Sequence, residues 1–355
     1  MNLCLIQIRK TSLLIAILIS FFLNNSASAQ ICTRNTILVE EIVTQLGKNC
    51  NEVNSKDLLQ IKHLDISFKV VKNLTQKDLE GLRGLESLIL AYSGLTSFPP
   101  FLKKDFSQLR VLNLRGNGFE KVKQSDFKGL INLNEINLSS NRIHKIDSSS
   151  FYPLKNLKVL KLEQNFLTSI PENLFRNSDL LEEIDLGGNQ ISLIKRRTFR
   201  NLKSLRKLNL HANEIRYIGE GVLFGLKNLE EISLSQNNLN WVPPSFFFHT
   251  KSIKRIYLGG NPLRYISGDL FLGLKNVEDI YLNYLQIVTF DATLFHGLPK
   301  LKNAVLNDNQ IEIVPKNAFD LSNFSSQAKV YLTRNPLKEE SITYLKGQLG
   351  SRFNF

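Results

Sequence analysis

The sequence has few of the side chains from which catalytic and metal sites are built. Only three cysteines and five histidines occur in 355 residues. The histidines are scattered and form no H-x-x-x-H motif or Cys/His cluster. No nucleophile elbow, phosphate-binding loop or dinucleotide fingerprint is present. We therefore expect a protein that is not an enzyme and that holds neither a metal ion nor a cofactor.

The sequence also lacks any long apolar run after its first thirty residues. The apolar stretch 13–23 follows Arg9 and Lys10 and precedes the small residues Ala27-Ser28-Ala29. This order is typical of a secretory signal peptide with its cleavage site, and the run is short for a membrane span. We expect residues 1–29 to be removed on export, with an uncleaved anchor as the alternative. The localisation expected is secreted or cell surface, which means periplasmic or extracellular in a bacterium.

Cysteine is nearly absent from the expected mature chain. Cys4 lies in the signal peptide, and only Cys32 and Cys50 remain. An even pair of cysteines in an exported chain favours a disulfide bond between them.

One residue type recurs with a fixed period. Asparagines follow one another at the interval that separates Asn117 from Asn141, or at a multiple of it, and Leu285 takes the place of the missing member. Lys69 and Ser93 keep the register in two earlier turns, and a final, slightly longer turn ends at Asn335. The chain therefore contains about twelve turns. The asparagines in register are Asn117, Asn141, Asn165, Asn189, Asn213, Asn237, Asn261 and Asn309.

Apolar residues keep constant offsets from these asparagines. Ile136 and Leu138, two residues apart, indicate a short strand before Asn141, and Phe151 follows ten residues after that asparagine. The pattern L-x-x-L-x-L-x-x-N-x-L resembles the leucine-rich-repeat family. This resemblance implies an α/β solenoid shaped like a horseshoe, with a parallel sheet on the concave face and irregular or short helical segments on the convex face. Where Leu285 replaces asparagine, we expect a locally altered bend.

The ends of such a solenoid need caps, because an open end exposes core and sheet edge. Residues 36–46 are predicted to be helical, and residues 50–66 resemble the N-terminal caps of secreted bacterial leucine-rich-repeat proteins, which favours a bacterial origin. Leu337, Ile342, Leu345 and Leu349 have the spacing of a short amphipathic helix. We expect an N-terminal cap over 30–54, repeats over 55–337 and a C-terminal cap over 338–355.

Because the register is constant, each repeat position forms a column across neighbouring strands. Seven residues before the asparagine position, acidic and basic residues alternate from Lys158 to Lys302, and one position later they alternate from Glu183 to Asp279. Opposite charges on adjacent strands can pair. We interpret these columns as self-neutralising ladders. They offer no uniformly positive track, so they do not favour nucleic acid as the partner.

The chain is nevertheless basic, with a formal net charge of +13. Its densest basic patch consists of Lys195, Arg196, Arg197 and Arg200, which follow a strand and should lie toward the convex side. Solvated surface charge is one interpretation of this patch. Binding of a glycan or another anionic polymer is the other.

The column four residues before the asparagine position should point outward from the middle of each strand. It is mostly polar in the first half of the chain and becomes aromatic with Tyr257, Tyr281 and Tyr331. Arg255, Asn283 and Tyr284 should lie near the first two tyrosines. Exposed Tyr and Arg clusters are typical of interface hot spots. Cross-strand pairing for stability, or contact with the C-terminal cap, are the structural alternatives.

The sequence thus predicts an extracellular or cell-surface protein that binds another protein on its concave face, in adhesion or in host or envelope contact. Binding of a glycan or anionic polymer through the basic loops is the first alternative. Inhibition of an enzyme is the second.

Overall fold

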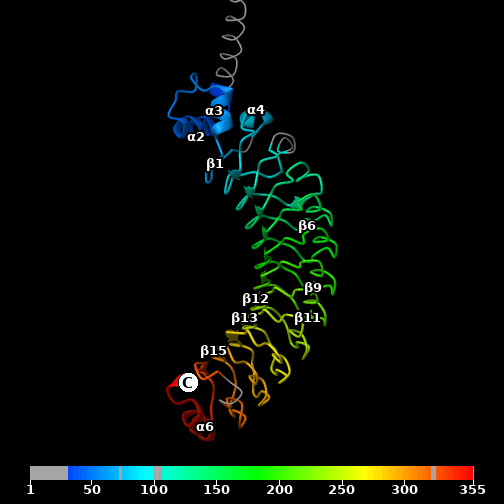
Figure 1. Cartoon of the computed structure of the whole chain (residues 1–355), viewed down its shortest axis with the longest axis vertical. Coiled ribbons are helices and arrows are strands. Elements are labelled where there is room, and N and C mark those ends of the chain that lie inside the picture. Colours follow the sequence, from blue (N-terminus) through cyan, green and yellow to red (C-terminus); the bar gives the residue numbers. More distant parts are fainter. Residues whose placement is uncertain (1–30, 72–73, 100–101, 103–105, 321–324, 355) are drawn as a thin grey trace, which may run out of the picture.

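Each repeat contributes one three-residue strand to a parallel sheet. The computed structural model describes residues 31–71, 74–99, 102, 106–320 and 325–354, so the predicted signal peptide lies outside the described residues. The turns stack into an arc whose inner side carries the sheet (Figure 1). This arrangement confirms the predicted solenoid with a concave parallel sheet.

The sheet has 13 strands, and the first twelve come from the repeats. All neighbouring strands within it are parallel. In spatial order the strands are β1 (His63–Asp65), β2 (Ser87–Ile89), β3 (Val111–Asn113), β5 (Glu135–Asn137), β7 (Val159–Lys161), β8 (Glu183–Asp185), β10 (Lys207–Asn209), β12 (Glu231–Ser233), β13 (Arg255–Tyr257), β14 (Asp279–Tyr281), β15 (Asn303–Val305), β16 (Lys329–Tyr331) and β17 (Phe353–Asn354).

The register between strands follows the sequence period. Partners such as Arg255 and Asp279 occupy the same position of consecutive repeats, and the longer final turn separates Asn303 from its partner Lys329. In most strands the middle residue is buried and the two flanking residues are partly exposed. The column of Tyr257 and Tyr281 therefore lies at the carboxyl end of the strands, and its predicted place in the middle was wrong. A strand of only three residues turns its middle side chain into the core.

The repeat asparagines hold the bend that follows each strand. The side-chain amide of Asn189 donates to the carbonyl oxygens of Leu162 and Leu186, both at 3.0 Å, and of Gly187 at 3.3 Å. Its Oδ1 accepts from the amide of Leu167 at 3.0 Å. The same contacts recur from Asn117 to Asn309 with few gaps. Each asparagine therefore satisfies buried backbone groups in its own turn and in the preceding one.

The residue before the asparagine position adopts the left-handed conformation in each of the twelve turns, with φ between 50° and 73°. Glycine fills this place at Gly116, Gly188 and Gly260. At Leu285 the predicted altered bend is confirmed. Gln286 and Arg264 also have positive φ there, and the amide of Leu263 donates to the carbonyl of Asn261 at 2.9 Å instead of to a side chain.

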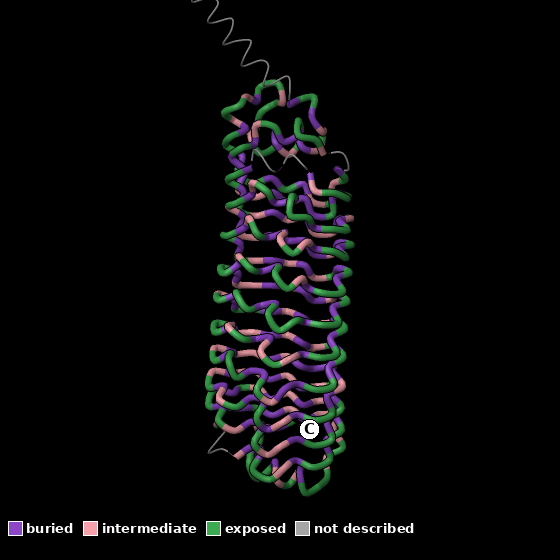
Figure 2. The backbone as a smooth tube through the Cα atoms, turned by 90° about the vertical axis from the view of Figure 1, so that its right-hand side faces the viewer, coloured by how far each residue is buried: buried purple, intermediate pink, exposed green. Residues whose placement is uncertain are grey.

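The outer side of the arc is filled by phenylalanine. In most neighbouring turns the rings of this column pack against each other, with centroids 5.3 Å apart for Phe295 and Phe319. Leu223 takes the place of a phenylalanine between Phe199 and Phe247. All of the phenylalanines are fully buried. On the face that Figure 2 shows, buried segments recur from turn to turn. Four two-residue strands also lie on this side, namely β4 (Lys121–Val122), β6 (Lys145–Ile146), β9 (Leu193–Ile194) and β11 (Tyr217–Ile218) (Figure 1). The phenylalanines are Phe127, Phe151, Phe175, Phe199, Phe247, Phe271, Phe295 and Phe319.

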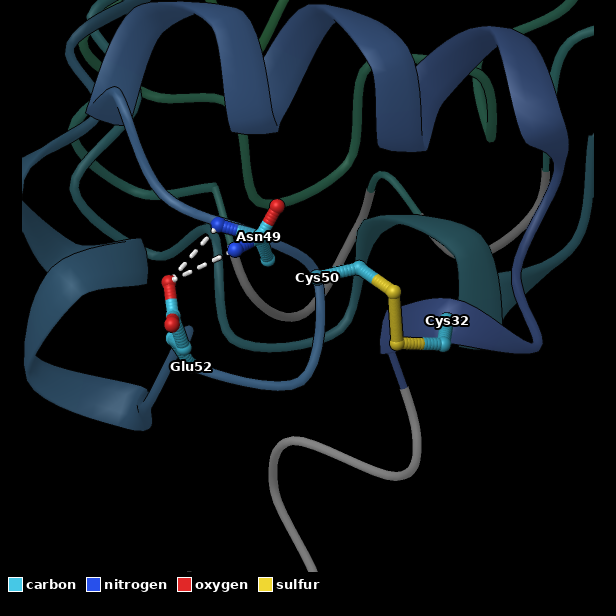
Figure 3. The surroundings of a disulfide bond; sticks show 4 residues. All are labelled: Cys32, Asn49, Cys50 and Glu52. Atoms are coloured by element: carbon cyan, nitrogen blue, oxygen red, sulfur yellow. Dashed lines mark hydrogen bonds between the residues drawn. A yellow bond between two sulfur atoms is a disulfide. The ribbon is translucent and has the colours of Figure 1, made fainter.

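Within the described residues, the helices α2 (Thr36–Leu46) and α3 (Ser55–Gln60) precede the first strand, and α2 confirms the predicted helix. The predicted disulfide joins Cys32 to Cys50, beside the bend where Asn49 donates from its backbone and side-chain nitrogens to Glu52 (Figure 3). The disulfide thus ties the segment before α2 to the segment after it.

A buried carboxylate connects this N-terminal segment to the first repeats. Asp78, in helix α4 (Gln76–Leu79), accepts from the amide of Asn35 at 2.8 Å and from the hydroxyl of Thr75 at 2.6 Å. Burial alone would raise the pKa of Asp78, but these hydrogen bonds and the nearby Arg34 hold the pKa below its ordinary value. Arg34 in turn donates to the carbonyl of Glu80 at 2.6 Å.

The predicted amphipathic helix at the other end is α6 (Glu339–Leu349). Leu345 and Leu349 are buried against the last repeats, and the amide of Val314 donates to the Ser341 hydroxyl. After the 3-10 turn η1 (Gly350–Arg352), β17 pairs with β16 and covers the edge of the sheet. This extra strand was not predicted.

Candidate binding surface

The two predicted neighbouring tyrosines form a stack on the concave face. The rings of Tyr257 on β13 and Tyr281 on β14 lie 4.6 Å apart, with 9° between their planes. Their Cα atoms are direct partners in the parallel register. Within the described residues, neither hydroxyl has a hydrogen-bond partner. The stack therefore presents two polar groups on an aromatic base.

Both phenols stay protonated at neutral pH. Partial burial raises the pKa of Tyr257 and of Tyr281 above the ordinary value of a phenol. The carboxylate of Asp279 acts in the same direction on both tyrosines, and that of Glu231 acts so on Tyr257. The hydroxyls can therefore donate hydrogen bonds as well as accept them.

Arg255 lies beside this stack, as predicted, but its charge is paired. Its Nε donates to Glu231 at 2.6 Å, and this bond raises the pKa of the guanidinium further. The side chains of Arg255 and Glu231 are 34% and 30% exposed. Arg255 is thus held in one orientation next to Tyr257, with part of its guanidinium open to solvent.

A shallow hollow of about 340 Å³ opens in the sheet next to Tyr257. It exists because Ser233 and Asn209 are smaller than the tyrosines that follow in the same column. Its polar walls carry both signs of charge and can donate and accept hydrogen bonds. The hollow is lined by Glu183, Ile184, Asp185, Lys207, Leu208, Asn209, His211, Glu231, Ser233 and Tyr257.

The other predicted site residues lie farther out. The side chain of Asn283 lies over Gly259, which has no side chain of its own. The backbone amide of Gly260 donates to the backbone carbonyl of Asn283 at 2.9 Å. Tyr284 is 55% exposed at the bend, where its hydroxyl accepts a long bond of 3.4 Å from Arg334.

Tyr331 is separated from Tyr281 by the strand of Val305. The structure therefore brings together Tyr257, Tyr281 and Arg255, while Tyr284 and Tyr331 lie at the margin of the same face.

Most neighbours in the first predicted charge column pair across the strands, and in the second column Arg255 pairs with Glu231. Glu230 lies between two cations, with Arg206 at 2.7 Å and Lys254 at 2.9 Å. The bonds from Lys254 and Arg206 lower the pKa of the Glu230 carboxyl. Lys158–Glu182 and Lys302–Glu278 continue the column at 2.9 and 2.6 Å. Much of the charge on the sheet is therefore neutralised by its neighbours.

The predicted basic patch lies after β9, between two grooves on the outer side. Arg197 and Arg200 line a groove of about 460 Å³ together with Arg176. Arg196, Arg197 and Arg200 also line a second groove of about 330 Å³, which ends at Phe224. Lys195 is exposed but lines neither groove. Within the described residues, none of these four predicted cations forms an ion pair.

Exposed aromatic residues on the outer side were missed by the sequence reasoning. Phe224 and Phe248 are 52% and 53% exposed, and Tyr217 stacks on Trp241 at 6.4 Å. Reading the same repeat columns beyond the strands would have found them. In the described part of the chain, no group of three metal-ligating side chains occurs, and no helix has the length and apolar character to cross a membrane.

A curved solenoid with an inner parallel sheet and an asparagine in nearly every bend defines a repeat protein of the binding-scaffold type. The chain belongs to the leucine-rich-repeat family. Six overlapping matches to the leucine rich repeat cover 107–165, 131–191, 155–215, 179–239, 204–263 and 227–287. No curated protein matches the chain.

Solved structures have the same fold. A leucine-rich-repeat protein of Leptospira interrogans is 25% identical, with a TM-score of 0.74 over 84% of this chain and 74% of that one. An internalin of Listeria monocytogenes is 22% identical, with a TM-score of 0.71 over 88% of this chain and 86% of that one.

A chain in the Toll–Spatzle complex of Drosophila is 23% identical, with a TM-score of 0.74 over 79% of this chain. This similarity covers only 38% of that chain. These similarities show the fold, and one fold can carry many different functions.

Proposed function

We propose that the protein binds another protein outside the cytoplasm, through the concave face of its C-terminal turns. The observation that carries this proposal is the Tyr257–Tyr281 stack, of which Tyr257 lines the hollow next to Ser233. Rigid aromatic side chains with a polar end are the residues that dominate protein interfaces. Arg255 supplies an oriented cation at the same place.

Two further facts support this assignment. The Cys32–Cys50 disulfide suits an oxidising compartment, in agreement with the predicted export signal. The Toll chain of similar fold is solved in complex with the protein Spatzle. Leucine-rich-repeat solenoids use their concave surfaces as extended binding sites.

The test is capture of proteins from a cell-surface extract by the chain from Gln30 onward, which contains every described core residue. The variant Tyr257→Ser with Tyr281→Ser should lose the captured protein, because each hot-spot tyrosine contributes about 2 kcal/mol, or roughly 30-fold in affinity. Lys161→Ser, in the same column on β7, is the matched control and should retain it.

Capture that persists in the tyrosine variant would contradict the concave-face proposal. Binding that ignores the tyrosines but is abolished by salt would favour the anionic-polymer alternative, because exposed charges are screened within about 8 Å at physiological ionic strength.

A further inference from the structure

One row of side chains on the outer side is apolar in three consecutive turns. It is the residue that follows the buried phenylalanine position of each turn, which Leu223 occupies before Phe224, so it points away from the core. Arg176 and Arg200 are followed by Phe224, Phe248 and Leu272 in three consecutive turns. These three are 52%, 53% and 60% exposed. Contiguous exposed apolar residues on a repeat surface mark a contact site.

A second row, three residues later in each turn, is basic. Its members are Lys203, Lys227, Lys251 and Lys275, all exposed, and none forms an ion pair within the described residues. The backbone of this row is fixed, because Asn228 donates to the carbonyl of Lys203 at 2.8 Å and Asn276 to that of Lys251 at 3.0 Å. The lysines therefore stand in a regular line beside the apolar row.

We call the two rows together the outer ridge, meaning Phe224, Phe248 and Leu272 with the four lysines. It differs from the sheet face in its charge. On the sheet, cations such as Lys254 are paired with carboxylates, whereas the lysines of the outer ridge form no ion pair in the described part of the chain. The groove shared by Arg200 and Phe224 continues the positive charge onto the predicted basic patch.

The chemistry of the outer ridge fits an anionic lipid bilayer. We propose that the protein docks on such a surface through this ridge, with the two phenylalanines and Leu272 at the boundary between headgroups and acyl chains. The lysines contact lipid phosphates. Apolar insertion and attraction to anionic lipids together are what hold proteins at a membrane surface. Trp241 and Tyr217, exposed in neighbouring turns, are residue types enriched at that interface.

A single-stranded nucleic acid fits this ridge less well. Base stacking needs open aromatic faces. The ring of Phe248 has the ammonium of Lys251 above it, 4.4 Å from its centre, and His249 packs edge-on against Phe224 at 5.0 Å. A row of ring edges and short apolar tips can enter a headgroup layer but offers no platform for bases.

The test is co-sedimentation of the chain from Gln30 onward with vesicles of phosphatidylcholine, or of three parts phosphatidylcholine to one part phosphatidylglycerol. We expect binding to the anionic vesicles only. The variant Lys203→Gln, Lys227→Gln, Lys251→Gln, Lys275→Gln should bind at least about 100-fold more weakly, since each lysine near the surface contributes roughly five-fold. The variant Phe224→Ser, Phe248→Ser, Leu272→Ser should lose about ten-fold or more.

Matched controls come from the same two rows. Tyr152→Ser with Lys155→Gln removes an exposed aromatic residue and a lysine at equivalent positions in an earlier turn, away from the ridge, and should bind vesicles like the wild type. Tyr257→Ser with Tyr281→Ser should also retain vesicle binding. The two proposals can therefore fail independently: loss of protein capture would not contradict membrane docking, and loss of vesicle binding would not contradict protein binding on the concave face.

Three results would overturn the proposal. The first is no preference for vesicles with phosphatidylglycerol. The second is unchanged vesicle binding by the Phe224, Phe248, Leu272 variant. The third is complete competition by soluble polyphosphate or single-stranded RNA together with insensitivity to the apolar substitutions, which would assign the ridge to a soluble polyanion.

Discussion

Replacing Asn189 with leucine, the residue that occupies the equivalent place at position 285, should strongly destabilise the solenoid. Asn189 is 6% exposed and makes four hydrogen bonds to backbone groups at 3.0 to 3.3 Å. Each such bond contributes about 1 kcal/mol, and buried backbone groups left without a partner cost about 1–3 kcal/mol more. Leucine is similar in length, so little cavity cost is added. We expect Asn189→Leu to lower the free energy of unfolding by about 3–5 kcal/mol.

The assay is urea unfolding followed by circular dichroism, together with hydrogen exchange of the Leu167 amide, which donates to Asn189. That amide should exchange faster in the variant. The control is Asn240→Leu, the same substitution at an exposed asparagine with no side-chain hydrogen bond in the described structure, and it should change stability by about 0.5 kcal/mol or less. A loss of unfolding free energy below about 1 kcal/mol for Asn189→Leu would refute the reasoning. It would show that the bend does not need the hydrogen bonds of its asparagine.

Three further predictions concern the N-terminal segment and the charge ladder. Cys32→Ser with Cys50→Ser should lower the stability of that segment by about 3 kcal/mol for a loop of 18 residues, measured by urea unfolding against the oxidised wild type. Asp78→Asn should cost about 1–2 kcal/mol, because hydrogen bonds to a charged group are lost. Folding lowers the pKa of Asp78, so its carboxylate stabilises the folded state fully above the unfolded-state pKa of about 4. This stabilisation is lost as the pH falls through the folded-state pKa. The urea midpoint should therefore fall less steeply between pH 7 and 3 in the variant than in the wild type. Glu230→Gln should cost less than about 1 kcal/mol and the difference should vanish in high salt, whereas a large, salt-independent loss would show that the ladder is more than a surface ion-pair column.

The repeat architecture was predictable because the same residue pattern recurs in each turn. Asparagine and phenylalanine at fixed offsets specify the bend and the packing of the outer side, and the structure places them where the register requires. The stacking of Tyr257 on Tyr281 follows directly from that register. The disulfide and the helix over 36–46 were likewise predictable from local sequence.

The features that could not be predicted depend on structural details that the repeat pattern of the sequence does not specify. The period does not specify how many residues of each strand pair, so the tyrosine column was assigned to the wrong place in the strand. Strand β17 arises from chain after the last repeat, where no neighbouring turn repeats the signal. Tyr284 falls away from the tyrosine stack because its left-handed backbone turns it toward Arg334.

The constant offset between neighbouring strands from β1 to β15 also makes the turns interchangeable units of length. Removal of one whole unit, for example residues 142–165, would join Asn141 directly to the residue that normally follows Asn165. The new junction would therefore have the sequence pattern of an ordinary bend. Because parallel neighbours lie about 4.8 Å apart, the deletion would shorten the inner face by that distance. The tyrosine stack and the outer ridge lie together in the later turns and would keep their mutual spacing, while both would move closer to Cys32 and Cys50. Lineages of this protein could thus change the reach between its N-terminus and its contact surfaces one turn at a time, without redesigning either surface.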